Sequence, residues 1–264
     1  MKKILDAIRK SSHVEVAAGI LAGITIAIAA TVWYPQHAEK SAHSVAPVDS
    51  GTQHSLQSPN PAATAPAKQP ARFADVGRTP ISADARFIAD WVADSGDAQG
   101  MSFVIIDKKR ARVHVFDANA RLLGASPVLL GIAPGDDTVP GIGDKPLSQV
   151  RFEERTTPAG RFVGERGHNA RGEDVVWIDY DAAVSMHRVL TTNPAEHRLE
   201  RLATPRIDDN RVSFGCVNVP IAFYEQFIRP TFAQSHAIIY VLPDVKTLQQ
   251  VFTNAYDVAV AHGA

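Results

Sequence analysis

Short apolar runs separated by polar turns dominate the chain from residue 102 onward, a pattern typical of β-strands. Residues 102–107 (SFVIID) and 111–116 (ARVHVF) flank the polar triplet KKR and predict a hairpin, with His114 on its solvent face. Four more runs are expected to form strands: residues 121–131, 174–180, 183–187 and 237–243. The pattern therefore predicts a mostly β fold of sandwich or barrel-like form, with a few short helices.

Helical periodicity is confined to three segments. Ser82 can cap a helix over residues 83–94, whose large apolar residues fall on one helical face. Residues 220–228 and 245–256 also favour helices. These patterns divide the globular part into a helical lead-in at 73–100, a β-rich domain at 101–243, and a C-terminal helix and tail at 244–264.

The first 35 residues have the pattern of a membrane anchor. Residues 16–34 (VAAGILAGITIAIAATVWY) carry no charge, and as a helix they would span about 28 Å, close to the hydrocarbon thickness of a bilayer. Basic residues precede this run, so we expect a cytoplasmic stub, an anchor in the inner (cytoplasmic) membrane and a periplasmic C-terminal part. The alternative is a signal peptide cleaved near the small-x-small site at 27–29, which would release the protein into the periplasm.

Residues 36–72 separate this anchor from the globular part. The segment is rich in Pro, Ala, Ser and Gln and nearly lacks large apolar residues. It cannot bury enough apolar surface to offset the entropy of ordering, so we expect a disordered, flexible linker.

Composition narrows the function classes. The chain has 27 Lys and Arg against 28 Asp and Glu, a formal net charge of −1, so nothing marks it as a nucleic-acid-binding protein. Its scattered histidines lack metal-ligand spacing, and we expect His168, His197 and His236 on the surface. We expect neither a metal nor a cofactor.

Cys216 is the only cysteine in the sequence. A lone cysteine is most often a small buried apolar residue. An exported domain, however, lies in an oxidising compartment, where an unpaired thiol is a liability and its presence calls for a functional explanation. Gly215 beside it permits close approach of a substrate, and His187 at the end of another apolar run could take the proton of the thiol. The residues alone leave both roles open.

The neighbourhood of Cys216 resembles the catalytic domain of the L,D-transpeptidase (YkuD-like) family. The family signature is a histidine, a spacer, and then Ser or Thr, His, Gly, Cys, an apolar residue, and Asn or Arg. This chain has His187 and, after a spacer of 25 residues, the segment SFGCVN at 213–218. Residues 156–162 (TTPAGRF) resemble the family's Thr-Pro-x-Gly-x-Phe element, and the resemblance covers about residues 102–243.

This resemblance implies that Cys216 is a nucleophile and His187 its base. Three further residues would frame the site around the Cys216 amide: Ser213, Gly215 and Asn218. We also expect Arg188 and Arg211 to bind substrate. No metal or cofactor is implied.

The resemblance also implies a substrate, the stem peptide of peptidoglycan. The family forms an acyl-enzyme at the third, diamino acid residue of the stem and releases D-Ala. An amine acceptor, here a second stem peptide or a protein lysine, then takes the acyl group. Transfer to water would make the protein an L,D-carboxypeptidase or endopeptidase of the same fold.

Three departures from the family pattern keep a further alternative open. Phe214 stands where the family has a second histidine, Arg188 follows the base where glycine is common, and the spacer is longer than usual. The extra residues, 191–210, are charged and are expected to form a lid over the cleft. The alternative is a catalytically degenerate module that only binds peptidoglycan or a partner.

Overall fold

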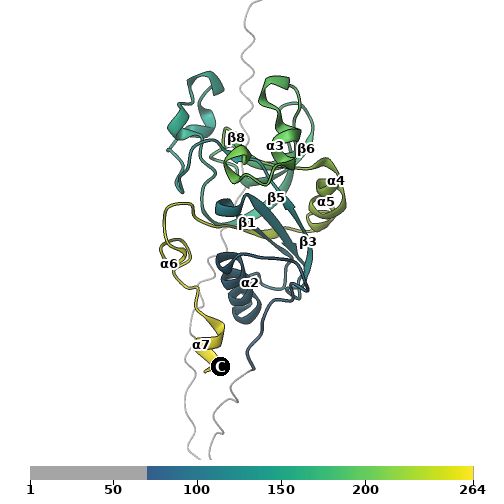
Figure 1. Cartoon of the computed structure of the whole chain (residues 1–264), viewed down its shortest axis with the longest axis vertical. Helices are drawn as coiled ribbons and strands as arrows, with labels where there is room; N and C mark the ends of the chain where they lie inside the picture. Colours follow the sequence, from purple (N-terminus) through teal and green to yellow (C-terminus); the bar gives the residue numbers. More distant parts are fainter. Residues whose placement is uncertain (1–69, 264) are drawn as a thin grey trace, which may run out of the picture. The chain divides into compact units, whose positions relative to one another are not determined.

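The six predicted runs each contribute a strand to one eight-stranded sheet within residues 70–263, the part of the chain that the computed structural model describes (Figure 1). The strand order is β3-β2-β1-β10-β5-β6-β7-β9. These strands are β1 (Phe103–Asp107), β2 (Arg112–Phe116), β3 (Leu122–Pro127), β5 (Gly160–His168), β6 (Asp174–Asp179), β7 (Val184–Arg188), β9 (Val217–Val219) and β10 (Ala237–Val241). A separate parallel pair consists of β4 (Leu130–Gly131) and β8 (Arg211–Ser213).

Strand β5 makes the sheet turn back on itself. Its first half, to Gly164, pairs with β10, and its second half, from Glu165, pairs with β6. Apolar side chains of β1 and β2 therefore share one core with those of β6, β7 and β9. The prediction of a mostly β, barrel-like fold is confirmed.

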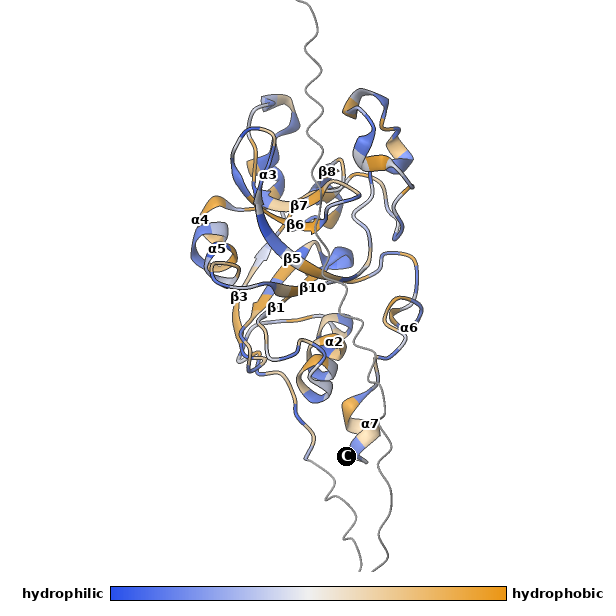
Figure 2. Ribbon diagram, turned by 180° about the vertical axis from the view of Figure 1, so that it is seen from behind, coloured by the Kyte–Doolittle hydropathy of each residue, from blue (hydrophilic) through white to orange (hydrophobic). Residues whose placement is uncertain are grey.

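Helix α2 (Ala83–Ser95) covers the other face of β1 and β10 (Figure 2). As predicted, Ser82 caps it: its Oγ accepts the N–H of Ala85 at 3.1 Å. The same hydroxyl donates to Asp107 at 2.6 Å, so the cap also ties the helix to the end of β1. The apolar side of α2 packs with the sheet in a second core that includes Ile88, Trp91, Val92, Ile105 and Tyr240.

The other helices are short. Residues 220–228 are helical as predicted, with α4 (Ile221–Phe223) followed by a π-helical turn (Tyr224–Ile228) and α5 (Arg229–Thr231). Only α6 (Leu248–Val251) forms within the predicted helix at 245–256, and α7 (Val258–His262) follows it. The 3₁₀ turns are Lys108–Arg110, Ile142–Asp144, Leu147–Gln149, Phe152–Glu154, Pro194–Glu196 and Ile207–Asn210, and α3 (Arg198–Ala203) lies between the last two.

One local prediction, the placement of His114, was wrong, and strand β5 was not predicted. His114 is buried, not on the solvent face, because it pairs with Ile105 on the side of the hairpin that α2 covers. Burial lowers the pKa of His114 to about 4, so its ring is neutral at pH 7. Strand β5 was not predicted, since its three glycines and charged residues hide any apolar alternation.

The anchor predicted at residues 16–34 lies outside the described residues, as does the linker up to residue 69. Across residues 70–263, none of the helices combines the length and the apolar character that a bilayer crossing requires.

A buried ammonium group joins four segments at one edge of the barrel. Lys108 follows β1 and is 0 % exposed. Its Nζ donates to Asp136 Oδ1 at 2.8 Å and to the carbonyls of Gly135 and Thr157 at 2.6 and 2.7 Å. Asp244 lies 3.6 Å from the same nitrogen. The ammonium therefore fixes the loop after β4, the loop before β5 and the loop after β10 together.

Asp136 completes this cluster. Its carboxylate also accepts the backbone N–H groups of Asp244, Val245 and Lys246 at 2.6–2.9 Å. Burial raises the pKa of Asp136, but the Lys108 ammonium and these N–H groups lower it more, to about 2. Because the folded pKa lies below the unfolded value, this stabilisation is complete above pH of about 4 and is lost as the pH falls toward 2.

Replacing Lys108 by Met should lower the free energy of unfolding by about 3–5 kcal/mol, because Asp136 would remain buried without its cation. Urea denaturation of the full chain at pH 7 measures this loss. The matched control is Lys109→Met, which removes the neighbouring exposed lysine and its 3.1 Å pair with Asp84. That control should change stability by less than about 0.5 kcal/mol. Equal losses in the two variants would contradict the structural role of Lys108.

Candidate active site

Cys216 and His187 come together because their strands are parallel neighbours. His187 lies near the end of β7, and β9 begins directly after Cys216. The ladder places His187 opposite Asn218, so the loop that carries the thiol runs beside β7. Cys216 is partly exposed, which a nucleophile requires.

The Cys216 sulfur rests against β7 and the turn before it. The Ser185 Oγ lies 3.7 Å from Sγ, and the carbonyl of Ala183 accepts the S–H at 3.6 Å. Ser185 and His187 are two residues apart on a strand, so they project from the same face. The thiol, a hydroxyl and an imidazole therefore share one side of the sheet.

Backbone contacts fix the imidazole of His187. Its Nδ1 lies 2.7 Å from the carbonyl oxygen of Arg188. A carbonyl can only accept, so Nδ1 carries the proton and Nε2 keeps the lone pair. His187 also lines a cavity of about 250 Å³ together with Gly172, Glu173, Asp174, Val175, Arg188 and Leu190. The ring is thus oriented for proton transfer and is reachable from solvent.

The thiol is shifted toward its reactive form. Burial raises the pKa of the Cys216 thiol, but the hydrogen bond and charge of His187 lower it more. The backbone and hydroxyl of Ser185 add smaller contributions in the same direction. The net pKa lies below the ordinary value, which increases the thiolate fraction at neutral pH.

The residues predicted to frame the site hold the backbone around Cys216. Ser213 Oγ accepts the N–H of Gly215 at 3.1 Å and donates to the Cys216 carbonyl at 2.7 Å. Asn218 Nδ2 donates to the same carbonyl at 3.2 Å. Gly215 has a φ of +136°, and a Cβ there would lie 2.7 Å from the carbonyl of Thr156. These contacts pin the carbonyl of Cys216 within the loop and fix the direction in which its side chain leaves the backbone.

The Thr-Pro element lies directly beneath this loop. Thr157 is buried, and its Oγ1 donates to the Gly215 carbonyl at 2.8 Å while accepting the N–H of Gly131 at 2.9 Å. The Thr157 carbonyl is one of the acceptors of the Lys108 ammonium. Thr157 therefore connects the cluster around Lys108 to the loop that carries Cys216.

Arg188 is held by protein groups on three sides. It pairs with Asp174 Oδ1 at 2.9 Å, donates to Glu225 Oε1 at 2.6 Å, and lies 4.2 Å from the ring centre of Tyr224. Tyr224 and Glu225 belong to the π-helical turn, a geometry found often at functional sites. These contacts give Arg188 a structural role at the end of β7; substrate binding by it stays a prediction.

Arg211 is directed toward the buried cluster. Its Nη2 donates to Asp244 at 2.7 Å and to the Lys108 carbonyl at 3.1 Å. The side chain of Arg211 is engaged in this cluster, so its predicted contact with substrate gains no support from these contacts.

Phe214 and the long spacer, which depart from the family pattern, each make a specific contact in the structure. Phe214 is 37 % exposed, and the Arg155 guanidinium lies 4.1 Å from its ring centre. In the long spacer, Arg198 at the start of α3 donates to Asn218 Oδ1 at 2.6 Å. The segment expected to form a lid is thus bonded to the cysteine motif itself.

Sequence reasoning missed two groups of this site. Ser185 could have been found, since it lies two residues before His187 in a strand-like run and must share its face. Arg198 had no such signal, because it reaches Asn218 from a turn 20 residues away.

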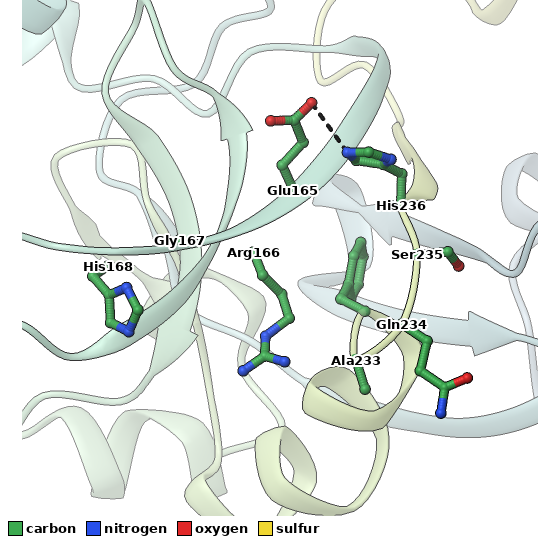
Figure 3. Close-up of a pocket in the computed structure, with 9 residues that line it drawn as sticks. Glu165, Arg166, Gly167, His168, Ala233, Gln234, Ser235 and His236 are labelled. Carbon is green, nitrogen blue, oxygen red and sulfur yellow. Dashed lines mark ion pairs between the residues drawn. The ribbon is translucent and has the colours of Figure 1, made fainter.

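His168 lies on the surface, as the sequence predicted. It is exposed at the end of β5 and lines a surface hollow of about 390 Å³ (Figure 3). In that hollow His236 faces Glu165 at 3.4 Å. Within residues 70–263, no group of three or more His, Cys, Asp or Glu side chains is arranged to hold a metal ion.

No protein-family model matches the chain, and no curated protein matches it by sequence. Solved structures do match. The helical cell shape determining protein Pgp2 from Campylobacter jejuni is 14% identical over 61% of this chain and 52% of its own, with a TM-score of 0.39. An L,D-transpeptidase from Mycobacterium smegmatis is 14% identical over 53% of this chain and 58% of its own, with a TM-score of 0.31.

A third match is the catalytic domain of an E. faecium L,D-transpeptidase, 14% identical over 53% of this chain and 96% of that domain, with a TM-score of 0.30. The match spans little more than half the length of the Campylobacter and Mycobacterium proteins. At such identities and TM-scores we base the function on the side chains of the site and the sequence motif.

The rate of alkylation by iodoacetamide should titrate with an apparent pKa below the free-thiol value of about 8.5, because His187 stabilises the Cys216 thiolate. Cys216 is the only thiol in the chain, so a rate–pH profile of the full protein reads this residue alone. In His187→Ala the apparent pKa should rise. The surface variant His236→Ala is the control and should leave the profile unchanged. A profile unaffected by His187→Ala would place the stabilising group elsewhere.

Arg188→Ala should destabilise the fold by about 1–3 kcal/mol, since Asp174 and Glu225 would lose charged hydrogen-bond partners. The control is Arg229→Ala, which removes a more exposed arginine from the same Glu225. Chemical denaturation of both variants measures the difference. If Arg229→Ala costs as much as Arg188→Ala, the clamp at the end of β7 is not what stabilises this region.

Proposed function

We propose that the protein is a cysteine-dependent peptidoglycan L,D-transpeptidase. The observation that carries this proposal is the thiol of Cys216, with its lowered pKa, beside an imidazole whose Nδ1 proton is bound to the Arg188 carbonyl. That pair lies in a motif that resembles the family signature, above a Thr-Pro element bonded to the same loop.

The first half-reaction forms a thioester. His187 Nε2 takes the proton of Sγ, and the thiolate attacks the carbonyl of the third, diamino acid residue of a stem peptide. The tetrahedral intermediate collapses with cleavage of the peptide bond. The imidazolium returns its proton to the leaving nitrogen, and D-Ala departs.

The second half-reaction restores the thiol. His187 takes a proton from the attacking amine of a second stem peptide or a protein lysine as its nitrogen bonds to the thioester carbonyl. The C–S bond breaks, the imidazolium protonates the sulfur, and a new amide links the two chains. Water in place of the amine would give a carboxylic acid, the product of an L,D-carboxypeptidase or endopeptidase.

The contacts of Arg188 and Phe214 weaken the case for a degenerate binding module. Arg188 is turned into a clamp with Asp174 and Glu225, and the Phe214 ring is covered by Arg155. Neither side chain is among the groups that contact the sulfur, which are the Ala183 carbonyl and the Ser185 hydroxyl.

We also propose that residues 16–34 anchor the protein in the inner membrane, with the catalytic domain in the periplasm. The uncharged run and the basic residues before it support this topology. Such a location would bring the site to peptidoglycan.

The test is covalent trapping followed by turnover. Incubated with an acylating β-lactam, the full chain should gain the mass of one inhibitor, on Cys216, and with muropeptides it should release D-Ala. Cys216→Ser should keep nearly full stability but lose turnover, because a serine hydroxyl is much harder to deprotonate than a thiol. Cross-linked products would identify the transpeptidase, and trimmed products alone the hydrolase. A wild-type chain that forms no adduct, with a serine variant that behaves like it, would overturn the proposal.

A further inference from the structure

An aromatic pair lies at the turn that follows β6. Trp177 and Tyr180 have ring centroids 5.1 Å apart and ring planes at 71°. Tyr180 is 74 % exposed, and Trp177 is half-buried. Large exposed aromatic rings are costly to leave in water and commonly mark a binding surface.

The backbone aims these rings at each other. The β6–β7 ladder shifts register between Trp177 and Asp179, and such a bulge re-aims the side chains after it. The turn is closed by the N–H of Ala183, which donates to the Tyr180 carbonyl at 3.0 Å. Gly167 on β5 leaves room for the indole: a Cβ there would lie 2.5 Å from Trp177 Nε1. The pair is thus built into the sheet.

The pair also lies on the same face as the nucleophile. Trp177 is directly opposite Ser185 in the ladder, and Ser185 Oγ is 3.7 Å from the Cys216 sulfur. Two strand spacings, about 10 Å, therefore separate the backbone of Trp177 from that of Cys216. Ala183, whose carbonyl accepts the S–H of Cys216, belongs to the turn that carries Tyr180.

Hollows lie on both sides of the two rings. One, of about 450 Å³, is lined by the rings with Gly141, Gly143, Asp144, Asp181 and Ala183. The other, of about 530 Å³, is lined by the rings with Val163, Glu165, Arg166, Gly167, His168 and Ile178. Each is large enough for a sugar ring, and together they form a path across the aromatic pair.

We propose that Trp177 and Tyr180 form a subsite for the glycan strand of the substrate, which takes neutral N-acetylhexosamine rings. Aromatic faces carry partial negative charge and attract the C–H groups of a sugar face. Asp144 and Asp181 offer acceptors for its hydroxyl groups, and the indole N–H offers a donor for an acetamido oxygen. A stem peptide bears carboxylates, which these two aspartates repel, so the hollow that they line favours the sugar.

The spacing supports this assignment, which rests on the proposed function for the position of the reacting bond. Reaction at the third stem residue leaves two residues and the linkage to the sugar between Cys216 and the glycan. Three extended units span about 10 Å, similar to the separation of the Trp177 and Cys216 backbones across the sheet.

Tyr180→Ala in the full chain tests the subsite. The KM for a disaccharide-bearing muropeptide should rise roughly fivefold or more, the effect of losing one stacking contact. The rate on the sugar-free stem peptide and the acylation by a β-lactam should not change. The control is Phe73→Ala, which removes a similarly exposed ring that packs beside α2 and should alter none of the three measurements.

Direct binding supplies a second readout. A tetramer of N-acetylglucosamine should shift the tryptophan fluorescence of the wild-type chain, and Trp177→Phe should abolish the shift while leaving β-lactam acylation intact. If the wild type is acylated but processes sugar-bearing and sugar-free substrates equally, and the tetramer gives no shift, the glycan subsite is overturned and the transpeptidase proposal stands. If no acylation occurs but the tetramer shift depends on Trp177, the proposed function fails and the subsite stands.

Discussion

The candidate site depends on one buried cation. The Lys108 ammonium would be costly to bury alone, and it is tolerated because Asp136 and two carbonyls surround it. One of those carbonyls belongs to Thr157, whose hydroxyl holds the Gly215 carbonyl beside Cys216. The contacts that the buried Lys108 ammonium requires thereby fix the position of the loop that carries Cys216.

The second constraint is the parallel pairing of β7 with β9. It brings His187 to the level of Asn218, and so places the loop that carries Cys216 beside the strand that carries the imidazole, although a long spacer separates the two in sequence. The Arg188 carbonyl selects the tautomer, and the clamp on the Arg188 guanidinium holds the end of the strand that presents this carbonyl. Arg188, the residue that departs from the family pattern, thus helps to orient the His187 imidazole through the ion pairs of its own side chain.

Periodicity and motif together predicted much of the fold and the centre of the site. The hairpin, the Ser82-capped helix and the mostly β class follow from local patterns that tertiary packing did not override. His114 could not be placed, because alternation says which residues share a face but not which face α2 will cover. The sequence pattern placed Lys108 in a turn and gave no sign of its burial. That burial depends on Asp136, which lies 28 positions later in the chain. Contacts of this kind between distant loops leave no periodic signal.

The long spacer between His187 and Ser213 also contacts the cysteine motif. Arg198 reaches from α3 to Asn218 Oδ1, while Asn218 Nδ2 holds the Cys216 carbonyl. An amide has one acceptor and one donor side, so Asn218 can join the two segments without giving up either bond. Any displacement of α3 must then break a charged hydrogen bond to Asn218, the residue that holds the Cys216 carbonyl. The spacer segment is therefore part of what holds the cysteine loop in place.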